Sequence, residues 1–199
     1  MFKYAFHCQH KLKMIAAGMG GDNSFERKMG SDHNTLVYGC DPSIGLKPRV
    51  TDPSPGFQFH PVGLGEKDGI LQFVQKAKSS GTQLAARYEP EVGDKLIDVP
   101  MKSVSTILKD LKWGNKLDIL KIDIEGTEYD VLNDLLESNL VIGQILVEYH
   151  GRFLPDGVEV TESMISKLSS KGFHKFHKSG EDYGFVNCEN LKRLCPEIF

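Results

Sequence analysis

The side chains best suited to chemistry lie in the segment Lys121–Gly126, which reads KIDIEG. The apolar run that leads into it predicts a buried strand at 118–125. Residues two apart on a strand share a face, so Lys121, Asp123 and Glu125 are expected to point the same way. Two carboxylates at the mouth of a buried strand repel each other and must be offset by a cation, hydrogen bonds, a metal or a raised pKa. Such offsets are typical of functional sites, which makes Asp123 and Glu125 candidate catalytic residues.

A second pair of ionisable residues, Glu148 and His150, ends the next predicted strand at 142–149. Their spacing puts both side chains near the same edge of the sheet. An imidazole titrates close to neutral pH, so His150 is a candidate general base, and a histidine bonded to a carboxylate for packing is the alternative. Together with the two carboxylates of the preceding segment, this pair also contains the donors of an oxygen-rich divalent-metal site, which spacing alone does not decide.

A glycine-rich corner, Gly18–Gly21, follows the first predicted strand at 12–17. Glycine permits a tight turn and a close approach by a ligand, and the next helix offers free N–H groups. A plain strand-to-helix corner is the alternative. The dinucleotide fingerprint requires a third glycine at position 23, where this chain has Asn23, so a pyrophosphate-binding site fits poorly.

Asp41 ends the second predicted strand, 23 residues after Gly18. An acidic side chain at this place can accept hydrogen bonds from both hydroxyls of a ribose. The alternative is a turn cap ahead of Pro42. The glycine corner and Asp41 together indicate a binding site for a nucleoside.

The elements that must position these residues alternate between short apolar strands and amphipathic helices. A box of Asn23 and Glu26 is expected to cap the first helix, and Ser103 the second. Strands are predicted at 12–17, 36–40, 57–62, 118–125 and 142–149, and helices after 23, at 103–111, after 127 and at 161–170. This alternation predicts an α/β fold with a mostly parallel sheet and helices on both faces. Ligands of such sheets bind beyond the carboxyl ends of the strands.

Two regions depart from the alternation. The segments 173–178 and 183–187 predict an antiparallel hairpin at the edge of the sheet. Residues 66–99 contain one candidate strand at 70–74 and otherwise no steady period, which predicts a long functional or mobile loop.

The composition is that of one globular domain spanning 1–199, because 40% of the residues are hydrophobic and 26% charged. The net charge of −3 disfavours non-specific nucleic-acid binding. No apolar stretch approaches the roughly 18 residues of a membrane span, and the start of the chain lacks a signal-peptide core, so a cytoplasmic location is expected. Reduced thiols are therefore expected at the four cysteines, Cys8, Cys40, Cys188 and Cys195.

Several of these segments together resemble the FkbM-type S-adenosylmethionine-dependent methyltransferases. The segments are AGMGGDNSFE at 17–26, YGCDP at 38–42, VGLG at 62–65, LDILKIDIEGTE at 117–128 and VEYH at 147–150. The resemblance covers about residues 12–187 and is most specific in the fourth segment. It implies a Rossmann-like class I methyltransferase fold, with a mostly parallel seven-stranded sheet and a C-terminal antiparallel hairpin, and usually O-methylation.

The resemblance also implies roles in cofactor binding. Gly18 and Gly20 would form the turn under the methionine part of S-adenosylmethionine, and Asp41 would bind the ribose. The backbone at Val62 and Gly63 would line the adenine. The remaining corner residues are counted with the cofactor site: Gly21, Asp22 and Asn23. Many members carry an acidic residue directly before the first glycine, and Asp22 would replace it as partner of the cofactor's amino group.

In the same comparison Asp123 and Glu125 would face the sulfonium and the acceptor, and His150 would lie beside the acceptor hydroxyl. We therefore predict methyl transfer from S-adenosylmethionine to a hydroxyl of a sugar, glycan or small-molecule acceptor, with a divalent metal left open. An NAD-dependent oxidoreductase and a non-catalytic nucleoside-binding module are the alternatives. The loops at 64–99 and 151–160 would contact the acceptor.

Overall fold

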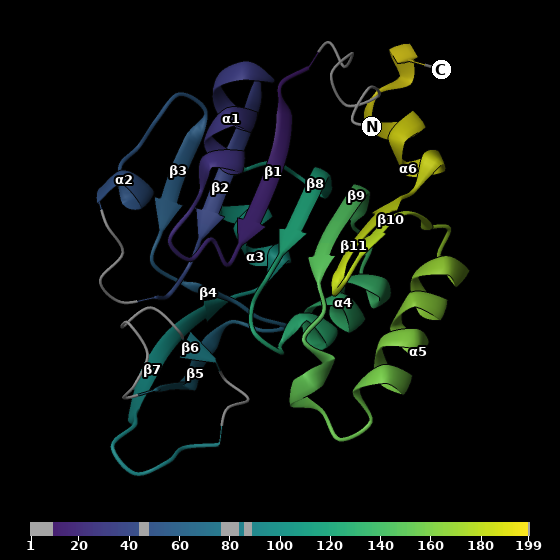
Figure 1. Cartoon of the computed structure of the whole chain (residues 1–199). Helices are drawn as coiled ribbons and strands as arrows, with labels where there is room; N and C mark the ends of the chain where they lie inside the picture. Colours follow the sequence, from purple (N-terminus) through teal and green to yellow (C-terminus); the bar gives the residue numbers. More distant parts are fainter. Residues whose placement is uncertain (1–9, 44–47, 77–83, 86–88, 199) are drawn as a thin grey trace.

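A seven-stranded sheet forms the centre of the computed structural model, which describes residues 10–43, 48–76, 84–85 and 89–198 (Figure 1). The strand order is β10-β11-β9-β8-β1-β2-β3, and β11 alone runs in the direction opposite to the other strands. The strands are β1 (Leu12–Ala17), β2 (Thr35–Cys40), β3 (Phe57–His60), β8 (Lys116–Ile122), β9 (Val141–Glu148), β10 (His174–Ser179) and β11 (Asp182–Val186). This is the mostly parallel sheet with a C-terminal antiparallel hairpin that the sequence predicts.

The strand order reverses between β1 and β8. From β1 the chain builds outward through β2 and β3, and then returns to place β8 on the other side of β1. At such a switch point the connections after the two central strands leave toward opposite faces of the sheet, which opens a crevice beyond their carboxyl ends. Gly18 follows β1 and Asp123 follows β8, so both residues lie at this crevice.

Helices cover both faces of the sheet. Alternate residues of β1 divide between them: Ile15 packs in a core with α3, α4 and α5, whereas Met14 packs with Met29 of α1. Burial on both faces explains why four consecutive residues of the strand, at 14–17, are apolar. The helices are α1 (Ser24–Asp32), α2 (Pro48–Thr51), α3 (Val104–Asp110), α4 (Glu128–Glu137), α5 (Gly157–Ser170) and α6 (Cys188–Leu194), with 3₁₀ turns η2 (Gly151–Phe153) and η3 (Pro196–Ile198). None of the helices in the described part of the chain is both long and apolar enough to cross a membrane.

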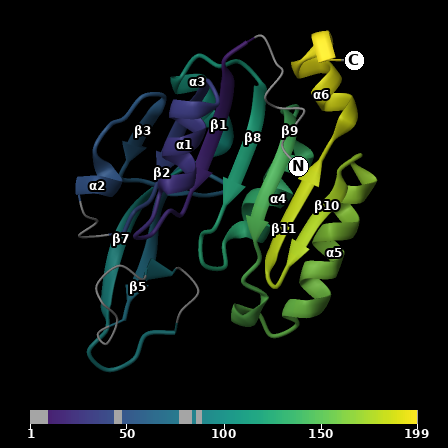
Figure 2. The same ribbon diagram turned by 45° about the horizontal axis from the view of Figure 1, so that its top comes forward.

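A second sheet replaces the long loop expected at 66–99. Its four strands pair in the order β4-β7-β5-β6, and they are β4 (Gly63–Leu64), β5 (Gly69–Gln75), β6 (Leu84–Ala85) and β7 (Lys95–Lys102). This sheet lies below the carboxyl ends of the main strands (Figures 1 and 2). Among the described residues of this sheet, Phe73, Val99 and Met101 form a small buried cluster, while Ile70 and Leu96 are exposed. So small a core leaves no regular apolar period in the sequence, which is why the expectation of a loop was wrong.

Of the two predicted helix caps, one is confirmed and one is wrong. Ser103 caps α3 as expected, because its hydroxyl accepts a hydrogen bond from the Thr106 N–H at 3.2 Å. The predicted box at α1 is wrong, since the Asn23 side chain makes no cap. Its amide instead donates to the Val50 carbonyl at 2.7 Å, which ties α1 to α2.

Gly18 allows the ends of β1 and β8 to meet. Its φ is +73°, and a Cβ at this position would lie 1.5 Å from the carbonyl oxygen of Asp123. The Gly18 N–H donates to Cys40 O at 3.0 Å, and the Asp123 N–H donates to Ala17 O at 2.9 Å. These bonds join the carboxyl ends of the three central strands. Gly20 also has a positive φ, of +53°, but open space surrounds its Cβ position.

We expect Gly18→Ala to destabilise the fold much more than Gly20→Ala. Both substitutions place a side chain in the left-handed region, at a cost of about 1–2 kcal/mol. Gly18→Ala must also displace the backbone of Asp123, and overpacking of this kind typically costs about 1–3 kcal/mol more. Urea unfolding of the two variants measures the difference. Equal unfolding midpoints would contradict the close approach.

Candidate active site

A cavity of about 270 Å³ lies at the carboxyl ends of β1, β2 and β8. Its walls come from the glycine corner, the ends of β2 and β8, and the second sheet. The lining residues are Gly18, Gly20, Asp41, Pro42, Ser43, Gly63, Leu64, Phe73, Asp123, Ile124, Glu125 and Thr127. Six of the residues singled out from the sequence thus border one cavity, together with Phe73 from the second sheet.

Asp41 forms the floor of the glycine corner and is only 3% exposed. One carboxylate oxygen accepts hydrogen bonds from the N–H groups of Met19 and Gly20, both at 2.8 Å. The other oxygen accepts from the Ser43 N–H at 2.8 Å. A carboxylate has about four acceptor positions, so roughly one remains for a ligand. Asp41 therefore shapes the corner as well as bordering the cavity.

The other cofactor candidates do not line this cavity. Asp22 accepts a hydrogen bond from the Ser24 N–H at 2.9 Å, at the start of α1. Asn23 is turned toward Val50, as described above. Val62 packs against the main core, and its neighbour Gly63 borders the cavity in its place. Gly21, like these residues, is not among the lining residues.

Three carboxylates gather around His150, directly behind the cavity. The imidazole Nε2 lies 3.7 Å from Asp123 Oδ1, 3.5 Å from Glu125 Oε2 and 3.8 Å from Glu148 Oε1. His150 is 1% exposed, whereas the Asp123 side chain is 38% exposed and borders the cavity. The tertiary structure thus brings together the three carboxylates and the histidine predicted from the two strand ends, and we call these four residues the histidine cluster.

Lys121 was expected on the same strand face as Asp123 and Glu125, and the extension of that face to Glu125 was wrong. Strand β8 ends at Ile122, and Glu125 adopts a φ of +54°, so the alternation of a strand does not continue to 125. The Lys121 ammonium instead pairs with buried Glu26 of α1 at 3.0 Å.

Glu128 lies in the first turn of α4, is fully buried and contacts His150 of the histidine cluster. Its Oε1 lies 2.6 Å from His150 Nδ1. Its carboxylate also accepts hydrogen bonds from the N–H groups of Ile124 at 3.2 Å and Gly126 at 3.1 Å. Sequence reasoning missed this residue, although the fourth family-like segment ends on it. An acidic residue in a first helical turn is usually explained by the helix dipole alone.

Burial raises the pKa values of Asp123, Glu125 and Glu148, and neighbouring carboxylates raise them further. Opposing positive charges come from Lys121 at Asp123, from Arg152 at Glu125 and Glu148, and from His150 at all three. For His150 itself, burial acts to lower the pKa. The hydrogen bond to Glu128 and the charges of Glu128 and Glu125 outweigh burial, so the pKa of His150 is raised. The cluster therefore concentrates perturbed groups beside a cavity, as functional sites do.

Arg152, which the sequence reasoning also missed, contacts the cluster from its exposed side. Its guanidinium lies 3.5 Å from Glu125 Oε2 and donates to Glu181. It also lies over the ring of Phe153, which stacks on His150 with ring centroids 5.8 Å apart. No local pattern at Arg152 predicts these ion pairs, because Glu125 and Glu181 are distant from it in the sequence.

The model of the Methyltransferase FkbM domain matches residues 11–175. The chain belongs to the FkbM methyltransferase domain family. The match includes the glycine corner, Asp41 and the whole histidine cluster. FkbM membership supports methyl transfer as the chemistry of this chain, and it implies S-adenosylmethionine as methyl donor in general terms.

None of the curated proteins matches this FkbM domain chain. Among solved structures it is similar to a putative hemolysin from Streptococcus thermophilus, at 13% sequence identity and a TM-score of 0.44. That similarity covers 96% of this chain and 67% of the other chain.

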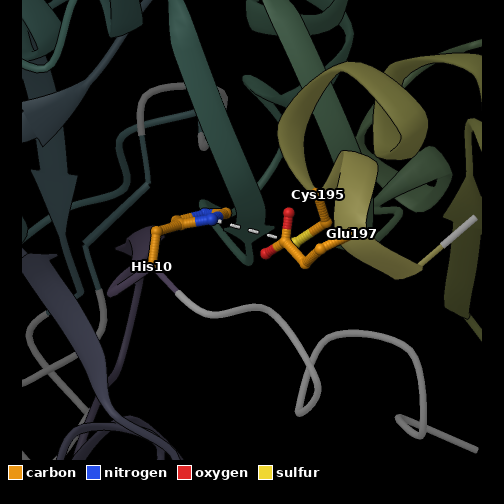
Figure 3. Close-up of side chains that lie close together, drawn as sticks. All are labelled: His10, Cys195 and Glu197. Carbon is orange, nitrogen blue, oxygen red and sulfur yellow. Dashed lines mark hydrogen bonds between the residues drawn. The ribbon is translucent and has the colours of Figure 1, made fainter.

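A second group of potential metal ligands lies at the opposite ends of the strands: His10, Cys195 and Glu197 (Figure 3). The His10 ring hydrogen-bonds Asp118 Oδ1 at 3.0 Å and lies 3.9 Å from the Cys195 sulfur. Cys195 is disulfide-bonded, so no thiolate ligand is available there, and the expectation of a reduced thiol was wrong at this position. Within the described part of the chain, Cys40 and Cys188 are free. Cys8 lies outside the described residues.

We expect Glu128→Ala to destabilise the FkbM domain by about 3–5 kcal/mol, the usual cost of removing one partner of a buried ionic pair. The substitution leaves His150 Nδ1 and two backbone N–H groups without their acceptor. Urea unfolding measures the change. Glu189→Ala is the matched control, because Glu189 pairs with Lys192 on the surface and its loss should not change stability measurably. Similar midpoints for the two variants would contradict a supporting role for Glu128.

Proposed function

We propose that this FkbM domain transfers a methyl group from S-adenosylmethionine to a hydroxyl group of a sugar or glycan. The observation that carries the proposal is one cavity bordered by a glycine corner, a buried aspartate and the exposed edge of the histidine cluster. The preference for a sugar comes from the resemblance to FkbM-type enzymes.

In this proposal the cofactor lies across the carboxyl ends of the central strands. Gly18 and Gly20 would border its methionine part, and the open space beside Gly20 leaves the backbone accessible to it. Asp41 would accept a ribose hydroxyl at its remaining acceptor position. Gly63 would border the adenine. Gly21, Asp22 and Asn23 do not line the cavity and would contribute by holding the glycine corner in place. Val62 would likewise hold its neighbour Gly63 in place.

The reaction is a direct displacement at the methyl carbon. The acceptor oxygen forms the new C–O bond while the C–S bond breaks, and its electron pair remains on sulfur, which becomes neutral. The hydroxyl proton passes to a base. Asp123 reaches the cavity and would receive it, while His150, 3.7 Å behind, would share the charge. Glu125 would orient the pair, and positioning of acceptor and donor would supply much of the acceleration.

We expect S-adenosylhomocysteine to stabilise the protein against heat, whereas NAD should not. A ligand present at about 100 times its dissociation constant stabilises the native state by about 2.7 kcal/mol. Asp41→Ala should weaken binding by about 10-fold or more, because a hydrogen bond to a charged group contributes about 1.5–3 kcal/mol. Thermal unfolding with each ligand, and calorimetric titration of the variant, measure these effects.

Stabilisation by NAD alone would favour an oxidoreductase. Stabilisation by neither ligand would argue against a nucleoside cofactor altogether. An Asp41→Ala variant that folds and binds S-adenosylhomocysteine with unchanged affinity would remove the ribose role.

We expect Asp123→Ala and His150→Ala each to reduce methyl transfer by about 10²- to 10⁴-fold, the range for a lost acid–base group. Affinity for S-adenosylhomocysteine should change little, since neither side chain belongs to the glycine corner. Transfer of labelled methyl groups to a panel of free sugars and oligosaccharides measures the rate. Glu189→Ala again serves as control. Unchanged turnover in both variants would exclude the assignment.

A further inference from the structure

We propose that the histidine cluster binds one divalent transition-metal ion, with Asp123, Glu148 and His150 as its protein ligands. The site rests on the geometry of these side chains. Its part in catalysis, to hold the acceptor hydroxyl, rests on the proposed function.

The ligand atoms have the separation that one ion requires. One donor atom from each residue lies within 4.8 Å of the other two, and Nε2 of His150 is 3.7 Å and 3.8 Å from the two carboxylate oxygens. Around an octahedral ion with bonds of about 2.1 Å, neighbouring ligands are about 3.0 Å apart and opposite ligands about 4.2 Å. The two distances from His150 Nε2 fall between these values, so small side-chain movements would complete the coordination.

In its neutral form, His150 would direct a lone pair toward the carboxylates. Glu128 already accepts two backbone hydrogen bonds and acts only as an acceptor, so Nδ1 of His150 must donate to it. In the neutral imidazole Nε2 is then an acceptor as well. Histidine ligands of metals typically donate their other N–H to a carboxylate in this way.

Hydrogen bonds among the cluster residues do not account for the arrangement. N–H···O bonds are normally about 2.7–3.2 Å long. The nearest carboxylate oxygen lies 3.5 Å from His150 Nε2, although the ring is almost completely buried. Longer distances to three separate oxygens suit an ion between the groups.

Asp123 and Glu148 have few direct positive partners. Among the described residues, Asp123 and Glu148 form ion pairs within 4.0 Å only with His150. Lys121 pairs with Glu26, and Arg152 lies with Glu125 and Glu181. A dication would offset the charge of these two carboxylates more fully than one shared histidine does.

The donor set favours a particular class of ion. Carboxylates suit Mg²⁺ and Mn²⁺, and imidazole suits first-row transition metals, so one imidazole with two carboxylates fits Mn²⁺ or a similar ion. Three protein ligands leave positions open, and Asp123 borders the cavity. A hydroxyl bound at an open position would lose its proton more easily, because a metal ion lowers its pKa.

Titration of the chelator-treated, dialysed protein with Mn²⁺, followed by the electron paramagnetic resonance signal of free Mn²⁺, tests the site. We expect one saturable ion per chain. Asp123→Asn and Glu148→Gln should each weaken binding at least 10-fold, which is the lower end of the effect even of outer-shell partners. The matched control is Asp182→Asn. Asp182 is exposed, and it lies opposite Glu148 on the neighbouring strand without belonging to the proposed ligand set. Near-ultraviolet circular dichroism checks that each variant is folded.

No stoichiometric binding by the wild-type protein, or equal binding by the folded variants and the control, would overturn the metal site. Full methyl transfer in excess chelator would exclude a catalytic role for the metal. Asp123 would then remain the base, as in the proposed function. A protein that binds Mn²⁺ as expected but neither binds S-adenosylhomocysteine nor transfers methyl groups would keep the metal site and overturn the proposed function.

Discussion

The contact between the backbones of Gly18 and Asp123 is the constraint on which the rest of the site depends. It brings the carboxyl ends of β1 and β8 so close that no Cβ fits between them. The cavity therefore begins directly at the reversal of strand order. It also fixes where the chain leaves β8, and hence the direction in which Asp123 and Glu125 extend. A side chain at position 18 would separate the glycine corner from the carboxylates.

Burial of charge around this contact follows two different rules. Asp41 and Glu128 are satisfied almost entirely by backbone N–H groups and one imidazole, and they serve to hold loops in place. Asp123 and Glu148 have no such partners among the described residues beyond His150, and their pKa values are raised. Buried carboxylates of the first kind position a site, whereas those of the second kind remain available to a proton, a cation or a substrate.

Local patterns predicted several features correctly because their causes are local. Continuous apolar runs identified the central strands, and Ser103 was recognised as a cap from its place before an apolar helix. The second sheet escaped prediction since its few buried residues come from strands that are only half covered. The capping box failed at Asn23 because a tertiary partner, the Val50 carbonyl, binds its amide. Lys121 likewise found its partner Glu26 on a distant helix.

By itself the sequence determined the α/β class, the segments that resemble the FkbM family and the candidate residues at the strand ends. Periodicity and turn chemistry are encoded within a few neighbouring residues. Only the tertiary structure decided which of those candidates meet. Whether Asp123, Glu148 and His150 share one point in space depends on strand order, on where β8 ends and on the buried Glu128 beneath them. These are contacts between residues far apart in the chain, and no local pattern carries them.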